Sequence, residues 1–170
     1  MEAGRGTIRA ARVTLRPLDP GTATAIVMGD RPSRGWASDF PADGDVMVAR
    51  MTAQAPPVDV TNPVAEPWLV RWLVECQGEV VGGVGCKGAP RDGAVEIGYG
   101  IVSSVQGRGV ATEAVGALIG ALADAGVTTV RAETLVDNHA SRRVLEKLGF
   151  VETGRRHDDV GVLIAWERTL

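Results

Sequence analysis

Hydrophobic residues recur with two different periods along the chain, and together they predict a mixed α/β fold. Residues 68–75, 80–87 and 95–102 form three apolar runs rich in β-branched residues, and short turns that contain glycine separate them. Such runs predict three neighbouring strands of an antiparallel meander. Between residues 110 and 125 the apolar positions instead recur at helical spacing along one stripe, which predicts an amphipathic helix that ends at Gly126.

Shorter signals predict the remaining elements. Asp19, directly before a proline, predicts the start of a short helix, because aspartate is a good N-cap and proline suits the first helical position. Asp137 or Asn138 predicts the start of another helix, and Gly149 before Phe150 predicts its end in a Schellman turn. The other expected elements are strands at 7–18, 127–136, 151–156 and 160–169, and a helix at 45–54 within a proline-rich stretch, 29–67.

The turn between the strand at 95–102 and the following helix carries the clearest binding signal. It contains two closely spaced glycines, Gly107 and Gly109, around Arg108. A strand that ends in such a turn and opens a helix leaves backbone N–H groups unpaired at the positive end of the helix dipole, and these bind anions such as a pyrophosphate. Glycine lets the backbone approach the phosphates, and Arg108 adds charge. A tight turn without a ligand is the alternative, because lone glycine motifs also occur by chance.

Length and composition indicate a single globular domain over residues 1–170. Of its 170 residues, 45% are apolar and 23% are charged, as in ordinary soluble proteins. A net charge of −3 gives no electrostatic reason to expect nucleic acid as a partner. No stretch approaches 18 apolar residues, and residues 1–6 contain no apolar signal region, so we expect a cytoplasmic protein that is neither secreted nor membrane-spanning.

Cys76 and Cys86 are the only cysteines, and both lie in apolar, strand-like surroundings. Reduced, buried thiols are the expected state, although a disulfide between adjacent strands stays open as an alternative. Two cysteines and two histidines dispersed along the chain do not form a metal-ligand pattern, so we expect no metal.

Several short motifs together resemble one protein family. The run Gln106-Gly107-Arg108-Gly109-Val110-Ala111 resembles the Gln/Arg-x-x-Gly-x-Gly/Ala signature of the GNAT acyl-CoA N-acyltransferases. Downstream, Asn138-His139-Ala140-Ser141 and Glu146-Lys147-Leu148-Gly149-Phe150 resemble the next helix of that superfamily in its RimJ/RimL-like branch, which Glu96-Ile97-Gly98-Tyr99 also fits. The resemblance covers about residues 67–156, and motifs in the right order are far more specific than any one alone.

The resemblance implies a fold and a co-substrate. The fold would be a mixed, mainly antiparallel sheet with a V-shaped split, flanked by helices, and acetyl-CoA would bind in the split. Backbone groups of Ile101 and Val102 would pair with the pantetheine, and their N–H groups could polarise the thioester carbonyl. The residues implied in holding the pyrophosphate are Gln106, Gly107, Arg108, Gly109, Val110, Ala111 and Thr112.

Glu96 is the expected general base. It is a carboxylate in a strand that is otherwise apolar or glycine, and glutamates at comparable positions serve as bases in many members of the family. Burial near a cleft would raise its pKa toward the useful range. The alternative is a structural glutamate paired to an arginine. Tyr99 is the competing catalytic candidate, and it lies on the opposite face of the strand unless a bulge reverses the faces.

The leaving thiolate needs a partner, and the usual one is missing. Many GNAT enzymes carry a tyrosine as general acid directly before the motif that begins at Glu146, whereas this chain has Leu145. In the RimJ/RimL-like branch a serine three residues after the asparagine can take that place, which is Ser141 here, and Asn138 would hydrogen-bond the pantetheine. The alternative is that Asn138 only caps the helix and Ser141 only lies in its first turn.

These features predict acyl-CoA-dependent N-acetylation of a primary amine. The acceptor would be a protein N-terminus or a small molecule beside residues 29–67, where Trp36, Phe40 and Met47 either line the cleft or anchor a loop to the core. A succinyl-CoA or other short-acyl-CoA transferase is one alternative. A catalytically silent CoA-binding domain is the other, because Leu145 replaces the usual acid. The sequence leaves open whether the chain forms a homodimer.

Overall fold

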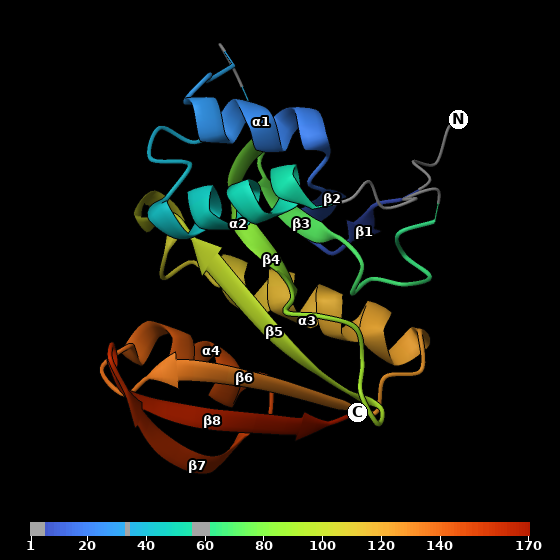
Figure 1. Ribbon diagram of the computed structural model, residues 1–170, viewed down its shortest axis with the longest axis vertical. Coiled ribbons are helices and arrows are strands. Elements are labelled where there is room, and N and C mark those ends of the chain that lie inside the picture. The colour runs from blue at the N-terminus through green and yellow to red at the C-terminus, as the bar shows by residue number, and fades with distance from the viewer. Residues whose placement is uncertain (1–5, 33–34, 56–61) are drawn as a thin grey trace.

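The computed structural model describes residues 6–32, 35–55 and 62–170, which form alternating strands and helices (Figure 1). Residues 1–5, where no signal region was expected, and two parts of the proline-rich stretch, 33–34 and 56–61, lie outside the described residues. In chain order the elements are β1 (Ile8–Arg9), β2 (Val13–Pro17), α1 (Pro20–Met28), α2 (Asp43–Gln54), β3 (Arg71–Cys76), β4 (Glu79–Cys86), β5 (Ala94–Ile101), η1 (Ser103–Val105), α3 (Val110–Asp124), β6 (Thr129–Leu135), α4 (His139–Lys147), β7 (Val151–Asp158) and β8 (Gly161–Thr169).

The strands form one mixed sheet in the order β1-β2-β3-β4-β5-β6-β8-β7. Neighbours are antiparallel except β5 and β6, which run parallel. These two strands pair only through residues 94–96 and 129–131, after which they separate. Figure 1 shows the resulting V, closed near the C-terminus and open at the other ends of β5 and β6. The predicted sheet with a V-shaped split is therefore confirmed, and no strand among the described residues lies beside residues 97–101 of β5 on that edge.

Helices cover both faces of the sheet. α1 and α2 lie together over one face of β3, β4 and β5, and α3 lies on the opposite face (Figure 1). The apolar stripe of α3 packs against β2, β4 and β5, and Val115, Leu118 and Leu122 are fully buried there. A Cβ at Gly116 would lie 3.4 Å from Leu148 Cδ2, so this glycine allows α3 and α4 to pack closely.

The predicted helix ends are confirmed. The side chain of Asp19 caps α1, and Asn138 Oδ1 accepts the Ser141 N–H at 3.0 Å at the start of α4. Gly149, with φ +78°, ends α4, and the Phe150 N–H donates back to the last turn, as in a Schellman ending. No helix among the described residues is long and apolar enough to cross a membrane.

Three strand predictions differ from the structure. Residues 7–18 form the hairpin of β1 and β2 rather than one strand, because the chain turns where the Ala10 N–H donates to Val13 O at 2.9 Å. The strand expected from residue 68 begins at Arg71, since Trp68 lies in a turn. β7 continues through Asp158, so the last hairpin turns two residues later than the pattern suggested. In the first two cases the apolar pattern continued across a turn that it does not mark, and in the third the strand continued through polar, exposed residues that suggested a turn.

Both cysteines are free thiols, at opposite ends of the β3–β4 hairpin, so the disulfide alternative is excluded. Burial raises the pKa of the Cys86 thiol to about 12, although the nearby charge of Arg71 opposes this. A thiol that stays protonated is a weak nucleophile, so Cys86 contributes packing rather than reactivity.

Candidate active site

β5 presents two chemically different faces. Ile97 is 1% exposed, and Tyr99 lies on the same face of the strand. Glu96, Gly98 and Gly100 lie on the other face, which looks toward α1 and α2. The register between β4 and β5 is regular over residues 97–101, so no bulge in β5 reverses the faces. The predicted assignment of the two faces is confirmed.

The free edge of β5 offers backbone groups to the split. The Val102 N–H donates to Val81 O at 2.9 Å, so it pairs within the sheet and cannot polarise a carbonyl in this conformation. Because antiparallel hydrogen bonds alternate along a strand, the backbone groups of Tyr99 and Ile101 point to the opposite edge, from which β6 has separated. Ile101 O accepts Gln106 Nε2 at 2.8 Å, and the Ile101 N–H faces the split. Of the two N–H groups that were expected to polarise the thioester carbonyl, the one of Ile101 faces the split and the one of Val102 does not.

The turn between β5 and α3 has the geometry of an anion site. Gly107 and Gly109 adopt left-handed φ angles of +75° and +81°, which glycine tolerates without strain. The N–H groups from Gly107 to Thr112 have no acceptor among the described residues, and they lie at the N-terminus of a 15-residue helix. Unpaired amides at the positive end of a helix dipole can bind a phosphate group.

Arg12 brings a second cation to this turn, and the sequence reasoning missed it. Its guanidinium donates to Arg108 O at 3.0 Å and to Glu113 Oε2 at 2.8 Å. Its Nη2 lies 3.2 Å from the place of a Cβ on Gly109. Burial raises the pKa of Glu113, but the amides of Arg12 and Val13 and the Arg12 guanidinium outweigh this and hold the pKa below its usual value. Nothing in the sequence links residue 12 to residue 109, because the packing of the β1–β2 hairpin against α3 brings them together.

Tyr99 and Ser141 meet across the split. The Tyr99 hydroxyl donates to the backbone O of Ser141 at 3.1 Å, so the ring connects β5 to the first turn of α4. Burial raises the pKa of Tyr99 to about 12, so the hydroxyl stays protonated at neutral pH. Asn138 has the capping role, since its Oδ1 accepts the Ser141 N–H. Leu145, in the position of the family's tyrosine, is 0% exposed and packs in the core.

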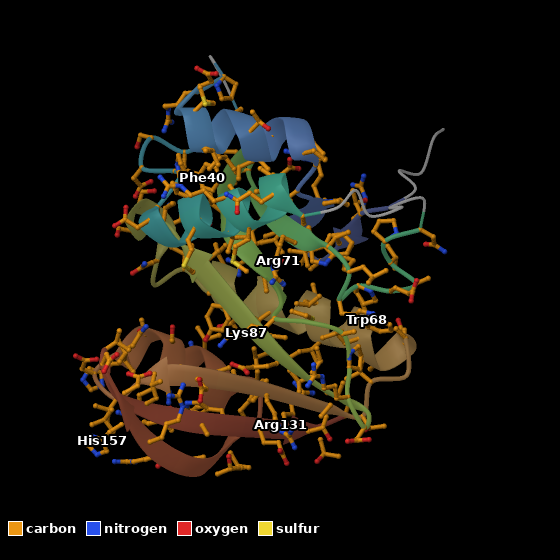
Figure 2. The ribbon with its side chains drawn as sticks, viewed as in Figure 1. Phe40, Trp68, Arg71, Lys87, Arg131 and His157 are labelled. Atoms are coloured by element: carbon orange, nitrogen blue, oxygen red, sulfur yellow. The ribbon has the colours of Figure 1, made fainter. Side chains whose placement is uncertain are left out.

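Glu96 is not a free carboxylate in this structure. It forms an ion pair with Lys87, the residue that directly follows the neighbouring strand β4, and the Glu96 side chain is 36% exposed. Figure 2 shows Lys87 beside β5, on the side of the sheet that carries α2. This ion pair resembles the alternative given for Glu96 in the sequence analysis, a structural glutamate paired to a cation, although the partner is a lysine rather than an arginine.

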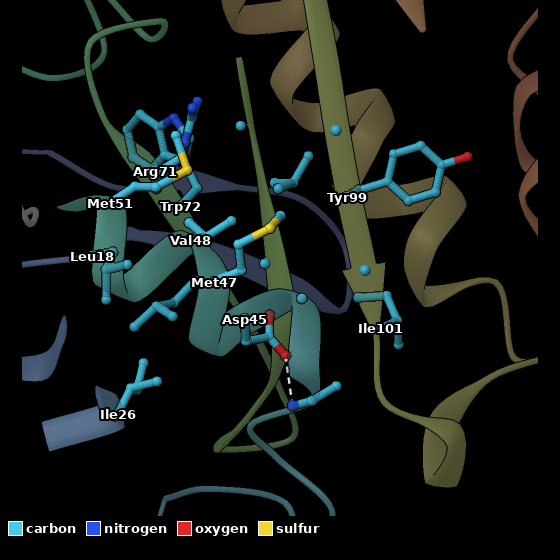
Figure 3. A pocket seen from close by; sticks show the side chains of 18 of the residues that line it. Leu18, Ile26, Asp45, Met47, Val48, Met51, Arg71, Trp72, Tyr99 and Ile101 are labelled. Atoms are coloured by element: carbon cyan, nitrogen blue, oxygen red, sulfur yellow. Dashed lines mark hydrogen bonds between the residues drawn. The ribbon is translucent and has the colours of Figure 1, made fainter. Parts of the chain in front are cut away.

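A pocket of about 610 Å³ lies between α1, α2 and the sheet (Figure 3). Leu18, Met47 and Met51 contribute to its apolar lining. Trp36 and Phe40 instead pack edge to face with ring centroids 5.1 Å apart, and neither lines the pocket. Of the three residues expected beside the acceptor, Met47 therefore lines the cleft, while Trp36 and Phe40 anchor the preceding loop to the core.

Three charged side chains line the same pocket, and the sequence reasoning singled out none of them. They are Asp45, Arg71 and Lys87. Burial raises the pKa of Asp45 to about 6, although the N–H of Ala42 donates to the carboxylate and opposes the rise. Burial also lowers the pKa of Arg71. Within the described part of the chain, no group of three or more His, Cys, Asp or Glu side chains is placed to hold a metal ion.

Comparison with known proteins identifies the family. A model of the acetyltransferase (GNAT) domain matches residues 12–151. The uncharacterized N-acetyltransferase YjdG of Bacillus subtilis (strain 168) is 40% identical over 75 residues. That match covers 43% of this chain and 45% of YjdG, so this chain spans less than half the length of that curated relative.

Solved acetyltransferases share the fold. RimL, a ribosomal L7/L12 α-N-protein acetyltransferase in complex with coenzyme A, has a TM-score of 0.70 at 19% identity over 96% of this chain and 98% of its own. The ribosomal-protein-S5-alanine acetyltransferase from Vibrio fischeri has a TM-score of 0.70 at 18% identity over 96% of each chain. Mycobacterium smegmatis RimJ, in complex with a CoA disulfide, has a TM-score of 0.65 at 24% identity over 92% of this chain and 81% of its own. At these identities the likeness establishes the fold.

Proposed function

This chain belongs to the acetyltransferase (GNAT) family, and on that premise we propose that it transfers an acetyl group from acetyl-CoA to a primary amine. The observation that carries the proposal is the run of unpaired amides from Gly107 to Thr112, directly beside the free edge of β5. A solved structure with the same fold has coenzyme A bound. A pocket on the other side of β5 leaves room for an acceptor.

The described residues suit the parts of acetyl-CoA. The amides from Gly107 to Thr112, with Arg108 and Arg12 nearby, would hold the pyrophosphate. The backbone of Ile101 would pair with the pantetheine as an added strand does, and its N–H would polarise the thioester carbonyl. The other expected contacts are Gln106, Gly109, Val110 and Ala111 along the turn, Val102 beside Ile101, and Asn138 on α4.

Two side chains are proposed for proton and charge transfer. The Ser141 hydroxyl would stabilise the departing thiolate, because Leu145 cannot do so and Ser141 lies in the first turn of α4 beside Tyr99. Tyr99 would hold that turn in place through its bond to the Ser141 carbonyl. Glu96 would have to leave Lys87 before it could accept a proton from the amine, which weakens its case as the base.

Release of free CoA thiol tests the proposal directly. Purified protein with acetyl-CoA and a panel of peptides, amino acids, polyamines and aminoglycosides should release thiol only when an acceptor is present, and mass spectrometry should find the acetylated amine. Succinyl-CoA in place of acetyl-CoA measures acyl preference. Calorimetric binding of acetyl-CoA without thiol release from any acceptor would instead indicate the silent CoA-binding domain.

Replacement of Ser141 by alanine should lower kcat by about 10–100-fold while the Kd of acetyl-CoA changes little. The hydroxyl would act on charge that develops only as the C–S bond breaks, so ground-state binding does not depend on it. The cap should survive, because Asn138 bonds the backbone N–H of residue 141 and alanine favours the helix. Pre-steady-state kinetics would ensure that acyl transfer is the step observed, and an unchanged rate of that step would leave Ser141 with a structural role.

A further inference from the structure

The floor of the pocket is a patch of sheet without side chains. Gly83 and Gly85 of β4 lie on the pocket side, and they pair with Gly100 and Gly98 of β5, respectively. Four glycines in two adjacent pairs expose bare backbone beside the free edge of β5. A ligand in the pocket can therefore approach the backbone at Ile101 without a Cβ in between.

Two oppositely charged side chains stand over this glycine floor. Asp45 Oδ1 lies 3.4 Å from the place of a Cβ on Gly83, and Arg71 Nη1 lies 3.4 Å from the place of a Cβ on Gly85. Figure 3 shows Asp45 and Arg71 at different ends of the pocket lining, with Met47 and Val48 between them. The glycines leave the space that these two charged groups occupy.

The Asp45 carboxylate and the Arg71 guanidinium do not form an ion pair with each other. No salt bridge joins them among the described residues, and the one hydrogen bond of the Asp45 side chain found there comes from the Ala42 N–H to Oδ2. Oδ1 is thus directed at the floor while Oδ2 is held by the start of α2. A partly buried charge is unfavourable unless it is paired and hydrogen-bonded, and neither side chain has an ionic partner in the described part of the chain.

The positions of Asp45 and Arg71 along the glycine floor suggest which part of an acceptor each would bind. Asp45 stands over the Gly83–Gly100 pair, next to Ile101, whose N–H faces the split. Arg71 stands over the Gly85–Gly98 pair, which lies two strand positions, about 6.6–6.8 Å, from the Gly83–Gly100 pair toward the closed end of the split. An amine beside Asp45 would lie at the acyl carbonyl, and an anionic group of the same molecule would reach Arg71.

We propose that the acceptor is an amino acid with an apolar side chain, whose ammonium group binds Asp45 and whose carboxylate binds Arg71. The proposal rests on the proposed N-acetyltransferase function and assigns its acceptor. An α-amino acid carries an ammonium and a carboxylate group in one small molecule, so each of these two charged side chains of the pocket lining would have a counter-ion on the same ligand. The apolar wall of Leu18, Met47 and Met51 would hold the side chain.

Asp45 then serves as the general base. The ammonium group gives one proton to the Asp45 carboxylate, and the neutral amine attacks the thioester carbonyl. The C–N bond forms as the C–S bond breaks, the second amine proton goes to the departing thiolate as free CoA thiol, and Asp45 returns its proton to solvent. Burial raises the pKa of Asp45 to about 6, which suits a base at neutral pH. Among the described residues the other charged side chains that line the pocket are Arg71 and Lys87, and Lys87 is paired with Glu96.

Matched acceptor pairs test the two charges separately. L-Phenylalanine, L-leucine and L-methionine would each be compared with the amine that lacks only the carboxylate: 2-phenylethylamine, isopentylamine and 3-(methylthio)propylamine. The wild-type enzyme should show a kcat/KM at least about tenfold higher for each amino acid than for its amine, because a charged hydrogen-bonded pair contributes about that factor or more.

Two variants should separate the contribution of Arg71 to carboxylate binding from that of Asp45 to catalysis. Arg71→Gln should raise KM for the amino acids by about 10–100-fold and leave the amines nearly unchanged. Asp45→Asn should lower kcat/KM for both members of each pair by about 100-fold and remove the acid limb of the pH profile near pH 6, since asparagine keeps the cap but accepts no proton. Arg50→Gln and Asp43→Asn are the controls, because they remove the same charges from exposed positions of α2 outside this pocket.

Thermal melting separates catalysis from capping. The pKa of Asp45 is raised from 3.8 in the unfolded chain to about 6 in the fold, so ionised Asp45 destabilises the protein at pH above 6, and this penalty disappears as the pH falls. Asp45→Asn should therefore leave Tm at pH 7.5 unchanged or higher, whereas loss of a purely structural cap would lower it.

Several results would overturn the proposal. Equal use of amino acids and amines by the wild type, or an equal effect of Arg71→Gln on both, would remove the carboxylate site. An acid limb lost in Glu96→Gln but retained in Asp45→Asn would move the base to Glu96. Acetylation of peptide N-termini without either member of any pair would overturn the acceptor class while the N-acetyltransferase function stands. Absence of thiol release with every acceptor would overturn that function itself.

Discussion

Replacement of Gly109 by valine should weaken acetyl-CoA binding by at least about 100-fold. Gly109 has φ +81°, and a side chain there would project toward Arg12 Nη2, 3.2 Å from the Cβ position. The new side chain would push the guanidinium from the turn and reorient the amides that follow, which together form the proposed pyrophosphate site. Isothermal titration calorimetry with acetyl-CoA measures the loss.

Backbone strain alone must be separated from this effect. A β-branched residue in the left-handed region costs about 1–3 kcal/mol of stability wherever it is placed. Gly126, at the other end of α3, has a similar φ of +86°, and a Cβ there meets nothing within 4 Å. Gly126→Val should therefore lose similar stability and keep its affinity for acetyl-CoA. A folded Gly109→Val protein with the affinity of the wild type would remove the cofactor site from this turn.

Local sequence signals predicted the elements that local interactions determine. The caps at Asp19 and Asn138 and the Schellman ending at Gly149 depend on hydrogen bonds within a few residues, and all three are in place. The two faces of β5 followed from strict alternation in a strand without a bulge. Strand boundaries were harder to predict, because a turn such as the one between β1 and β2 does not interrupt the apolar pattern.

The candidate site was harder to predict, because strand register and packing assemble it. Asp45 reaches the pocket from α2 and Arg71 from β3, and both meet the floor through their positions opposite Gly83 and Gly85. A sequence shows that Gly83 and Gly85 lie in an apolar run, but not which residues stand above them. The pairing of Glu96 with Lys87 likewise appears only once β4 and β5 are in register.

Replacement of Gly82 by alanine should destabilise the protein more than the other glycine substitutions considered above. Gly82 has φ +153°, and a Cβ there would lie 2.1 Å from Gly100 O and 2.9 Å from Ile101 Cα. Both contacts are with backbone, so no side chain can move aside, and β4 and β5 would have to separate. Strain of about 1–3 kcal/mol and overpacking of about 1–3 kcal/mol together remove a large share of a typical total stability of about 5–15 kcal/mol. Urea unfolding measures the loss.

Gly100→Ala is the matched control on the facing strand. Gly100 lies on the pocket floor, and an added Cβ would meet nothing within 4 Å, so the fold should keep its stability to within about 1 kcal/mol. The methyl group would instead stand between the acceptor and the backbone beside Ile101, so kcat/KM for the amine should fall while the Kd of acetyl-CoA stays constant. Equal stability of the Gly82→Ala and Gly100→Ala proteins would show that β4 and β5 do not approach as closely at Gly82 as the structure describes. A loss of stability confined to Gly82→Ala would show that the close approach of β4 and β5 at Gly82 holds together the two strands that carry the glycine floor and the free edge at Ile101.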